Sequence, residues 1–418
     1  MLNFEITKSS KLRAYFRAQL NFPPQNSKLA FESHHSSFIS ILCLSALLLV
    51  GFTTGSNKTT KVPIIDLTGD ITNQKQILLS DIATDIQYVK LEGNKDCFIK
   101  QIQSSSITKD HILIVEEATN NILLFSIDGK FLRQISRFGK GPGEHGRRPQ
   151  VSFDLKGTSI YVLYYKKLDL FDLNGKLTGT IRLDPSPQQA VDLGDNILLT
   201  FPYPESITND NYHFTIIDKK GKLIKKIFSW DNYKNDAGNA IYITRLTWYR
   251  DTLLYKNKYS DTIYGITKDL NITPRWFIKQ KTKQNPAVPE IPESGFFPGP
   301  FQETPYYFFN VGTFNNFMHP LMINKKTHEI TFVPYNKDIM RCGLVNDLDG
   351  GDLFWPERYM NGKSYRFDYP THLKDQVEKI LERKIKVKYP DKKQKLIEFI
   401  KGISEDDNQV LTIVTLKS

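Results

Sequence analysis

The chain contains 418 residues, of which 40% are hydrophobic, 12% aromatic and 24% charged, and its formal net charge at pH 7 is +11. This composition is typical of a globular protein and excludes a disordered, collagen-like or multi-pass membrane protein. The basic excess lies in residues 1–60 and 373–401 rather than in the main body, so we predict no nucleic-acid partner.

The first predicted element is an apolar segment within an N-terminal leader, residues 1–60. Residues 38–52 carry no charged side chain and follow a long positively charged stretch. Such a run has the length of a signal-peptide core and is shorter than the about 20 residues of a membrane-spanning helix. We therefore predict a periplasmic or secreted protein, with a membrane anchor through this segment as the alternative.

The end of the apolar segment also bears on lipidation. Residues 49–51 match the first positions of a bacterial lipoprotein box, but Phe52 stands where the lipid-accepting cysteine is required. Phenylalanine has no thiol, so lipidation by this route is excluded.

Beyond the leader the sequence contains Cys97 and Cys342, too few for a disulfide scaffold. We predict buried free thiols, with a single bridge as the alternative.

A recurring hairpin dominates the chain after the leader. An apolar strand, a turn with a Gly-Lys pair and a second apolar strand occur around Gly129, Gly175 and Gly221, which are 46 residues apart. Asp-Gly and Asn-Gly turns tolerate the positive φ angles of short hairpins, and alternating side chains on either side bury one face of each strand. Two weaker copies have Leu270 and Thr327 at the glycine position.

Further apolar runs precede each hairpin and give four strands per repeat. Four strands in about 40–50 residues are typical of a β-propeller blade, and no strand–helix alternation indicates a parallel α/β sheet. We predict an all-β fold, a six-bladed β-propeller over residues 61–418. Its sixth blade should combine residues 62–92, 340–360 and 409–418, because pairing the two ends removes open sheet edges. A β-sandwich is the alternative, although it does not predict the regular recurrence.

A helical insert is predicted at residues 371–402, before the last strand. Apolar residues from Leu373 onward follow helical spacing behind Thr371, the expected N-cap. A second helix is indicated by a capping-box pattern that starts at Asp391. The apolar stripe of the pair should cover the side or one mouth of the propeller, and its Lys and Arg side chains should face solvent.

The loop after the first hairpin carries the first candidate site. Residues 141–146 match G-x-G-x-x-G by letter, but the loop follows a hairpin and contains Pro142, so the strand–helix context of a dinucleotide site is missing. We expect a connection between blades. Its exposed amides, together with Arg147 and Arg148, form a weak candidate for anion or ligand binding.

Asp347, Asp349 and Asp352 form the candidate metal site. Carboxylates spaced along a tight loop supply the oxygen ligands that calcium prefers. The loop departs from an EF-hand because Gly351 stands at the third ligand position. An acidic turn without a cofactor is therefore favoured, with calcium as the alternative. Trp355 follows the loop and is predicted to pack near the channel mouth or to stack on a ligand such as a sugar.

The turn pattern, residues 137–144, the stretch 346–351, residues 354–356 and the strand before Leu416 together resemble a family of bacterial exported six-bladed β-propellers of the NHL/TolB-like kind. The resemblance covers residues 62–418. It implies the fold and an exported protein, and members of the family are often lipid-anchored. It implies no reaction, because the family has no settled activity.

The sequence contains no H-E-x-x-H or G-x-S-x-G motif, so we assign no catalytic residue. We predict a monomeric exported binding module that presents a loop face or its axial channel to a glycan, peptide or protein. The alternative is a metal-assisted hydrolase, lactonase or lyase in which Asp347 and Asp349 converge on the axis. Three oxygen ligands meeting in the channel would favour the enzyme, and an aromatic or basic lining would favour the binding module.

Overall fold

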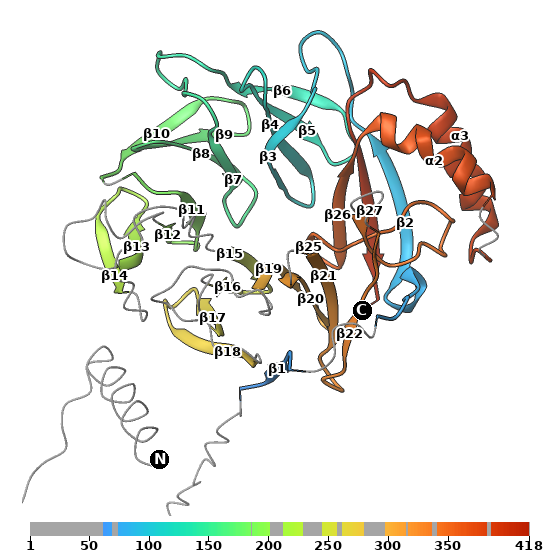
Figure 1. The fold of residues 1–418 in the computed structure, drawn as a ribbon. Helices are drawn as coiled ribbons and strands as arrows, with labels where there is room; N and C mark the ends of the chain where they lie inside the picture. Colours follow the sequence, from blue (N-terminus) through green and yellow to red (C-terminus); the bar gives the residue numbers. More distant parts are fainter. Residues whose placement is uncertain are drawn as a thin grey trace, which may run out of the picture. The chain divides into compact units, whose positions relative to one another are not determined.

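The computed structural model describes residues 62–68, 74–184, 186–200, 212–228, 245–256, 261–279, 297–314, 317–336, 341–382 and 386–417. Within these residues five four-stranded sheets and one five-stranded sheet form six blades. The blades surround a central axis (Figure 1). This is the predicted six-bladed β-propeller. The predicted signal-peptide-like or anchor segment, residues 38–52, lies outside the described residues.

The first three blades follow one another along the chain, each running from its innermost strand outward. Blade 1 contains β3 (Ile102–Ile107), β4 (His111–Glu116), β5 (Ile122–Ser126) and β6 (Phe131–Ser136). Blade 2 contains β7 (Gln150–Phe153), β8 (Ser159–Tyr164), β9 (Lys167–Asp172) and β10 (Leu177–Arg182). Blade 3 contains β11 (Gln189–Asp192), β12 (Asn196–Thr200), β13 (Tyr212–Asp218) and β14 (Leu223–Phe228).

Blades 4 and 5 repeat the same order of strands. Blade 4 contains β15 (Arg245–Tyr249), β16 (Thr252–Lys256), β17 (Thr262–Thr267) and β18 (Ile272–Lys279). Blade 5 contains β19 (Phe297–Glu303), β20 (Tyr307–Phe314), β21 (Phe317–Asn324) and β22 (Ile330–Phe332). A small separate ladder follows, formed by β23 (Tyr335–Asn336) and β24 (Arg341–Cys342).

The two ends of the described chain share the sixth, closing blade. It consists of β25 (Arg358–Met360), β26 (Lys363–Asp368), β27 (Val410–Leu416) and, outermost, β2 (Ala83–Lys90). β2 follows a short 3-10 helix, Leu79–Asp81, and pairs antiparallel with β27 along its whole length. The predicted sealing of the ring by both ends is therefore confirmed. β26 lies between the predicted segments and was not foreseen.

One N-terminal strand differs from the prediction that residues 62–92 belong to the closing blade. β1 (Ile64–Asp66) pairs in parallel with β18 and adds a fifth strand to blade 4. Ile65 is buried in the same apolar cluster as Trp276, and Lys279 pairs with Asp66 at 2.8 Å. β1 thus covers the outer edge of blade 4. An uncovered edge would leave the backbone N–H and C=O groups of β18 unpaired.

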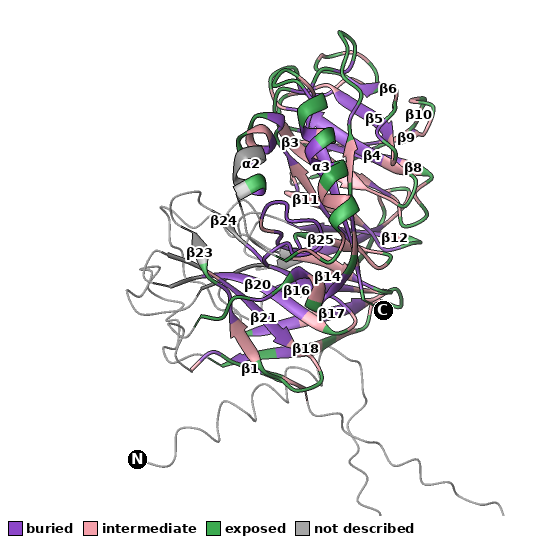
Figure 2. Cartoon of the chain, turned by 90° about the vertical axis from the view of Figure 1, so that its right-hand side faces the viewer, coloured by how far each residue is buried: buried purple, intermediate pink, exposed green. Residues whose placement is uncertain are grey.

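The apolar core is divided among the interfaces between neighbouring blades. In β4, Leu113 and Val115 pack against blade 2, whereas Ile112 and Ile114 pack against the closing blade. The middle strands are therefore buried on both faces, and this explains their continuous apolar runs. The prediction of one buried face fails for these strands because each blade is covered on two sides. Figure 2 shows buried residues along the strands and exposed ones in the outer loops.

The hairpin turns use positive φ angles as predicted, with one shift in position. Gly129, Gly175 and Gly221 have φ angles of 90°, 79° and 88°. Leu270 takes the same role without being glycine, with a φ of 60°. In the fifth copy His328, not Thr327, has a positive φ of 61°, because the turn is one residue longer and the His328 amide bonds to Asn324.

Two helices lie between β26 and β27, which confirms the insert. They are α2 (Pro370–Glu382) and α3 (Pro390–Gly402), and they pack on each other beside β2 (Figure 1). The predicted caps are wrong. Thr371 lies inside the first turn of α2, and α3 begins at Pro390, so Asp391 is not its N-cap. Proline suits the first helical position because that amide lacks a partner in any case.

Candidate ligand-binding channel

The innermost strands of all six blades enclose an axial cavity of about 580 Å³. Figure 1 shows β3, β7, β11, β15, β19 and β25 facing one another around the centre. Each of these strands contributes lining residues, among them Ser105, Gln150, Gln189, Thr247, Gln302 and Arg358. A pocket of this kind is the default place to look for ligand binding in a protein of this size.

The polarity of the lining follows from the sequences of the inner strands. β3 reads IQSSSI, and all six of its residues are only partly buried. The next strand of the blade, β4, is apolar and mostly buried. The inner strand therefore turns hydroxyl and amide groups toward the cavity, whereas the middle strands supply the core. Serine and glutamine in the first strand of a blade were a signal of the channel that the sequence predictions did not use.

Arg358 provides a cation in this lining. Its side chain is exposed to the cavity, and its Nη1 donates to Ser105 Oγ at 2.5 Å and to the Ser105 carbonyl oxygen at 3.3 Å. The guanidinium also stands 6.0 Å from the centre of the Phe367 ring. Desolvation by the surrounding blades lowers the pKa of Arg358, and the charge of Glu357 offsets part of that effect. Within the described residues Arg358 forms no ion pair.

Gln302 fixes the adjoining part of the wall. Its side chain is buried, and its Oε1 accepts bonds from Thr247 Oγ1 at 3.1 Å and from the Tyr359 amide at 3.2 Å. These bonds tie β15, β19 and β25 together. The positions of neighbouring lining residues are therefore set by an inner-strand network rather than by loops.

Aromatic and amide groups complete the lining. Trp248 and Tyr359 are partly exposed, and the buried Tyr161 bonds to Asp192 and Lys219 where blades 2 and 3 meet. Burial and the charge of Asp192 raise the pKa of Tyr161, so its hydroxyl stays protonated. The side-chain oxygen of Gln189 is buried and has no hydrogen-bond partner within the described part of the chain.

The predicted basic pair lies outside the axial cavity. Arg147 and Arg148 are exposed on the loop between β6 and β7, and Arg148 Nη2 lies 3.8 Å from Glu117. The loop amides expected to bind an anion are in part already occupied. Glu144 accepts a bond from the Gly141 amide at 2.8 Å. The loop thus places its own carboxylate where an external anion was expected.

The predicted metal ligands are directed to different protein groups. Asp347 accepts bonds from the amide and hydroxyl of Ser80, at 2.8 and 2.5 Å. Asp352 lies 3.0 Å from His372 of α2. The first contact joins the loop to the 3-10 helix Leu79–Asp81, and the second joins it to α2. Neither aspartate lines the axial cavity.

Asp349 occupies a more enclosed position in the same loop. Its carboxylate accepts bonds from Asn346 at 2.7 Å and from the Gly351 amide at 3.0 Å. Burial raises the pKa of Asp349 despite these bonds. Among the described residues no group of three or more His, Cys, Asp or Glu side chains is placed to hold a metal ion. The calcium site therefore stays a prediction without a ligand cluster to support it.

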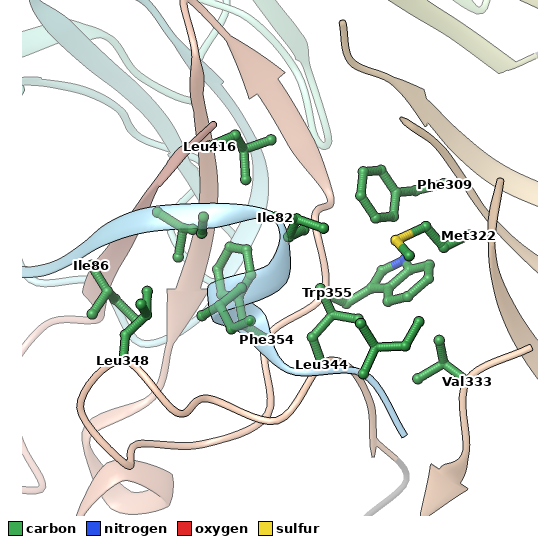
Figure 3. Packing of buried hydrophobic residues seen from close by; sticks show 14 of the residues in the cluster. Ile82, Ile86, Phe309, Met322, Val333, Leu344, Leu348, Phe354, Trp355 and Leu416 are labelled. Carbon is green, nitrogen blue, oxygen red and sulfur yellow. The ribbon is translucent and has the colours of Figure 1, made fainter. Parts of the chain in front are cut away.

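Trp355 is a core residue, which agrees with the prediction that it packs and not with the alternative that it stacks on a ligand. It is 6% exposed, and its ring lies 5.5 Å from that of Phe309 in an edge-on arrangement. Figure 3 shows it among Phe309, Met322 and Leu344, between blade 5 and the closing blade. No face of the indole is open to a sugar. Its neighbours from blade 5 could not be assigned from residues 346–356 alone.

Two other predictions concern thiols and membranes. Cys97 is a buried free thiol, as predicted, and the side chain of Cys342 is not among those described.

In the part of the chain that the structure describes, no helix combines the length and apolar character needed to cross a bilayer.

The chain is similar to several solved structures, and it shares its fold with one of them, BF0058. BF0058 of Bacteroides fragilis NCTC 9343, assigned as an exported protein, is 18% identical with a TM-score of 0.65, over 85% of this chain and 100% of that one. A DUF4221 member from Bacteroides vulgatus is 12% identical with a TM-score of 0.48, over 82% and 99% of the two chains. A catalytically inactive virginiamycin B lyase from Staphylococcus aureus is 16% identical with a TM-score of 0.37, over 61% and 77%.

The likeness to BF0058 supports the fold and nothing finer. No curated protein matches the chain. The model of the family described as "Domain of unknown function (DUF4934)" matches residues 62–415, which include every blade. The chain belongs to the DUF4934 family.

Proposed function

We propose that this protein is an exported binding module that holds a glycan or peptide segment in its axial cavity. The observation that carries the proposal is the cavity of about 580 Å³ to which every inner strand contributes. This volume falls within the range of about 300–1,000 Å³ that is usual for ligand sites. Binding at the centre of a rigid ring requires no rearrangement of the blades.

The chemistry of the lining supports a ligand rich in hydroxyl or amide groups. Ser152, Thr247 and Gln189 each offer both donors and acceptors. Trp248 and Tyr359 add flat apolar surface next to these polar groups. Sites that combine a few aligned polar side chains with aromatic ones are typical of binding pockets.

A metal-assisted hydrolase, lactonase or lyase remains the alternative. That reaction class needs several oxygen ligands that converge on one point. Within the described lining Glu357 supplies the one carboxylate, whereas Arg358 and the aromatic residues give the basic and aromatic character expected of a binding module. The lining therefore supports binding over the alternative.

The proposal extends to the compartment. BF0058, with which this chain shares its fold, is assigned as exported, and residues 38–52 have the length of a signal-peptide core. We place the protein in the periplasm or outside the cell. Fractionation of cells that produce the full chain should recover it there, and recovery from the cytosol would contradict this placement.

A cavity-filling variant tests the binding proposal. Wild-type protein and Ser152→Trp would be screened by thermal shift against defined sets of peptides and oligosaccharides, because an indole at Ser152 occupies the cavity. Thr178→Trp, on the exposed strand β10, is the matched control. We expect ligands that stabilise wild type and Thr178→Trp but not Ser152→Trp. The proposal would be overturned if a ligand stabilised all three proteins equally. It would also be overturned if no peptide and no oligosaccharide stabilised the wild-type protein.

A further inference from the structure

Arg358 is a cation whose Nε and Nη2 form no hydrogen bond within the described residues. Both of its printed hydrogen bonds, to the hydroxyl and the carbonyl of Ser105, leave from Nη1. Nε and Nη2 lie along the other edge of the planar guanidinium. That edge is the one that forms two parallel bonds with a carboxylate.

The guanidinium is also held in place without a competing anion in contact. Ser105 belongs to β3 of blade 1 and Arg358 to β25 of the closing blade, so the bond spans the seam at which the ring closes. The centre of the Phe367 ring lies 6.0 Å from the guanidinium carbon of Arg358. Glu357 affects the pKa of Arg358 through its charge but forms no ion pair with it. A preset, unpaired cation favours an anionic ligand group.

The rest of the lining is neutral and suited to hydroxyl groups. Gln150, Ser152 and Gln189 come from blades 2 and 3 and carry no charge. Trp248 of blade 4 adds an aromatic surface of the kind on which sugar rings pack.

We propose that the axial cavity binds an oligosaccharide that contains uronic acid, with Arg358 pairing to its carboxylate through Nε and Nη2. This inference rests on the proposed binding function and assigns its ligand class. Gln189 and Trp248 contact the neutral part of the sugar. Arg358 acts as a ligand-binding residue, and Ser105 is the positioning residue that keeps the free edge directed into the cavity.

The test compares two matched sugars and three variants of the full chain by calorimetric titration. The probes are trigalacturonate and the neutral trisaccharide of galactose. We expect wild type to prefer trigalacturonate, and Arg358→Gln to weaken its binding by about 10- to 100-fold, the size of a bidentate charged hydrogen bond. Arg358→Lys should weaken it less, since lysine keeps the charge but lacks the fork. Arg182→Gln, an exposed arginine on β10, should leave binding unchanged.

The outcomes separate this inference from the binding function beneath it. Equal affinity of wild type and Arg358→Gln for trigalacturonate, or no preference over the neutral sugar, would overturn the role of Arg358. Binding of an acidic peptide such as Ala-Glu-Ala that depends on Arg358, without binding of trigalacturonate, would overturn the sugar class and keep the binding module. Trigalacturonate binding unaffected by Ser152→Trp would overturn the cavity itself. Melting curves verify that each variant is folded. If Arg358→Gln does not fold, the comparison is made between wild type and Arg358→Lys.

Discussion

Glu303, at the end of β19, is a fully buried carboxylate whose charge depends on two neighbours. Arg275 bonds it at 2.8 and 2.6 Å through Nε and Nη2, and Lys325 at 2.6 Å. Burial alone would raise the pKa of Glu303, but these cations reverse the effect and lower it. A similar lysine–carboxylate pair joins Lys268 to Asp251 in blade 4, where both side chains are exposed.

Removal of the buried carboxylate should be costly. Glu303→Gln leaves two cations without their partner, and we expect the free energy of unfolding to fall by about 3 kcal/mol. Asp251→Asn, the exposed counterpart, should change it by less than about 1 kcal/mol. Urea unfolding at pH 7 measures both variants. A smaller loss in Glu303→Gln than in Asp251→Asn would show that burial does not decide the strength of these pairs.

The same carboxylate makes stability depend on pH in a defined direction. A folded-state pKa below the unfolded value of about 4.3 means that the contribution of Glu303 is fully present above that pH and is lost as pH falls through the folded pKa. The difference in unfolding free energy between wild type and Glu303→Gln should therefore shrink on acidification below about pH 4.3. A difference that grows on acidification contradicts this sign.

The acidic loop gives another prediction for single residues. Asp347, Asp349 and Asp352 already accept hydrogen bonds from Ser80, Asn346 and His372. Addition of calcium and then of EDTA is expected to leave the melting temperature unchanged, because binding would have to replace these bonds. A calcium-dependent rise of several degrees that EDTA reverses would establish a metal site in this loop.

At the scale of elements, the hairpin turns show how far a sequence pattern reaches. Gly129 is required by its surroundings, since a Cβ there would lie 2.3 Å from the Lys90 carbonyl oxygen. The 46-residue spacing predicted the hairpins because local turn chemistry determines them. The residue with the positive φ was predicted at Thr327, one position too early, because the flanking strands look the same whether the turn is shorter or longer. β26 and the two caps were missed since pairing and helix starts there depend on contacts distant in sequence.

His328 offers a test of the longer turn. It is exposed and has a φ of 61°, which costs an L-residue about 1 kcal/mol. His328→Gly should raise the free energy of unfolding by about 0.5–1 kcal/mol, whereas Thr327→Gly should lower it, because no positive φ is relieved there. Chemical denaturation of the two variants gives the comparison. If Thr327→Gly were stabilising instead, the residue with the positive φ would be Thr327, as predicted from the sequence, and not His328.

At the scale of the whole molecule, the ring depends on one strand. β27 pairs with β26 on one side and β2 on the other, so it joins residues 83–90 to residues 363–368. The sequence predicted this closure from two unpaired ends. It did not predict the site, because the lining takes two or three residues from each of six inner strands spread over the chain. No local pattern marks Arg358, whose role arises from Ser105 in another blade.

Removal of residues 409–418 should abolish cooperative folding. The deletion exposes the edges of β2 and β26 and opens the cores on both sides of the closing blade. A chain that ends at Lys417 is the control and should melt like wild type. Thermal melts followed by circular dichroism distinguish the two. A folded, soluble deletion with a wild-type melting temperature would mean that the ring is not sealed by β27.

The function proposed for the ring is to present one preset cavity to a ligand. A crystal structure of the full chain with trigalacturonate tests this most directly. We predict sugar density inside the axial cavity, with a carboxylate against Nε and Nη2 of Arg358 and a sugar ring near Trp248. Ordered sugar on an outer face, with the axial cavity unoccupied, would contradict it.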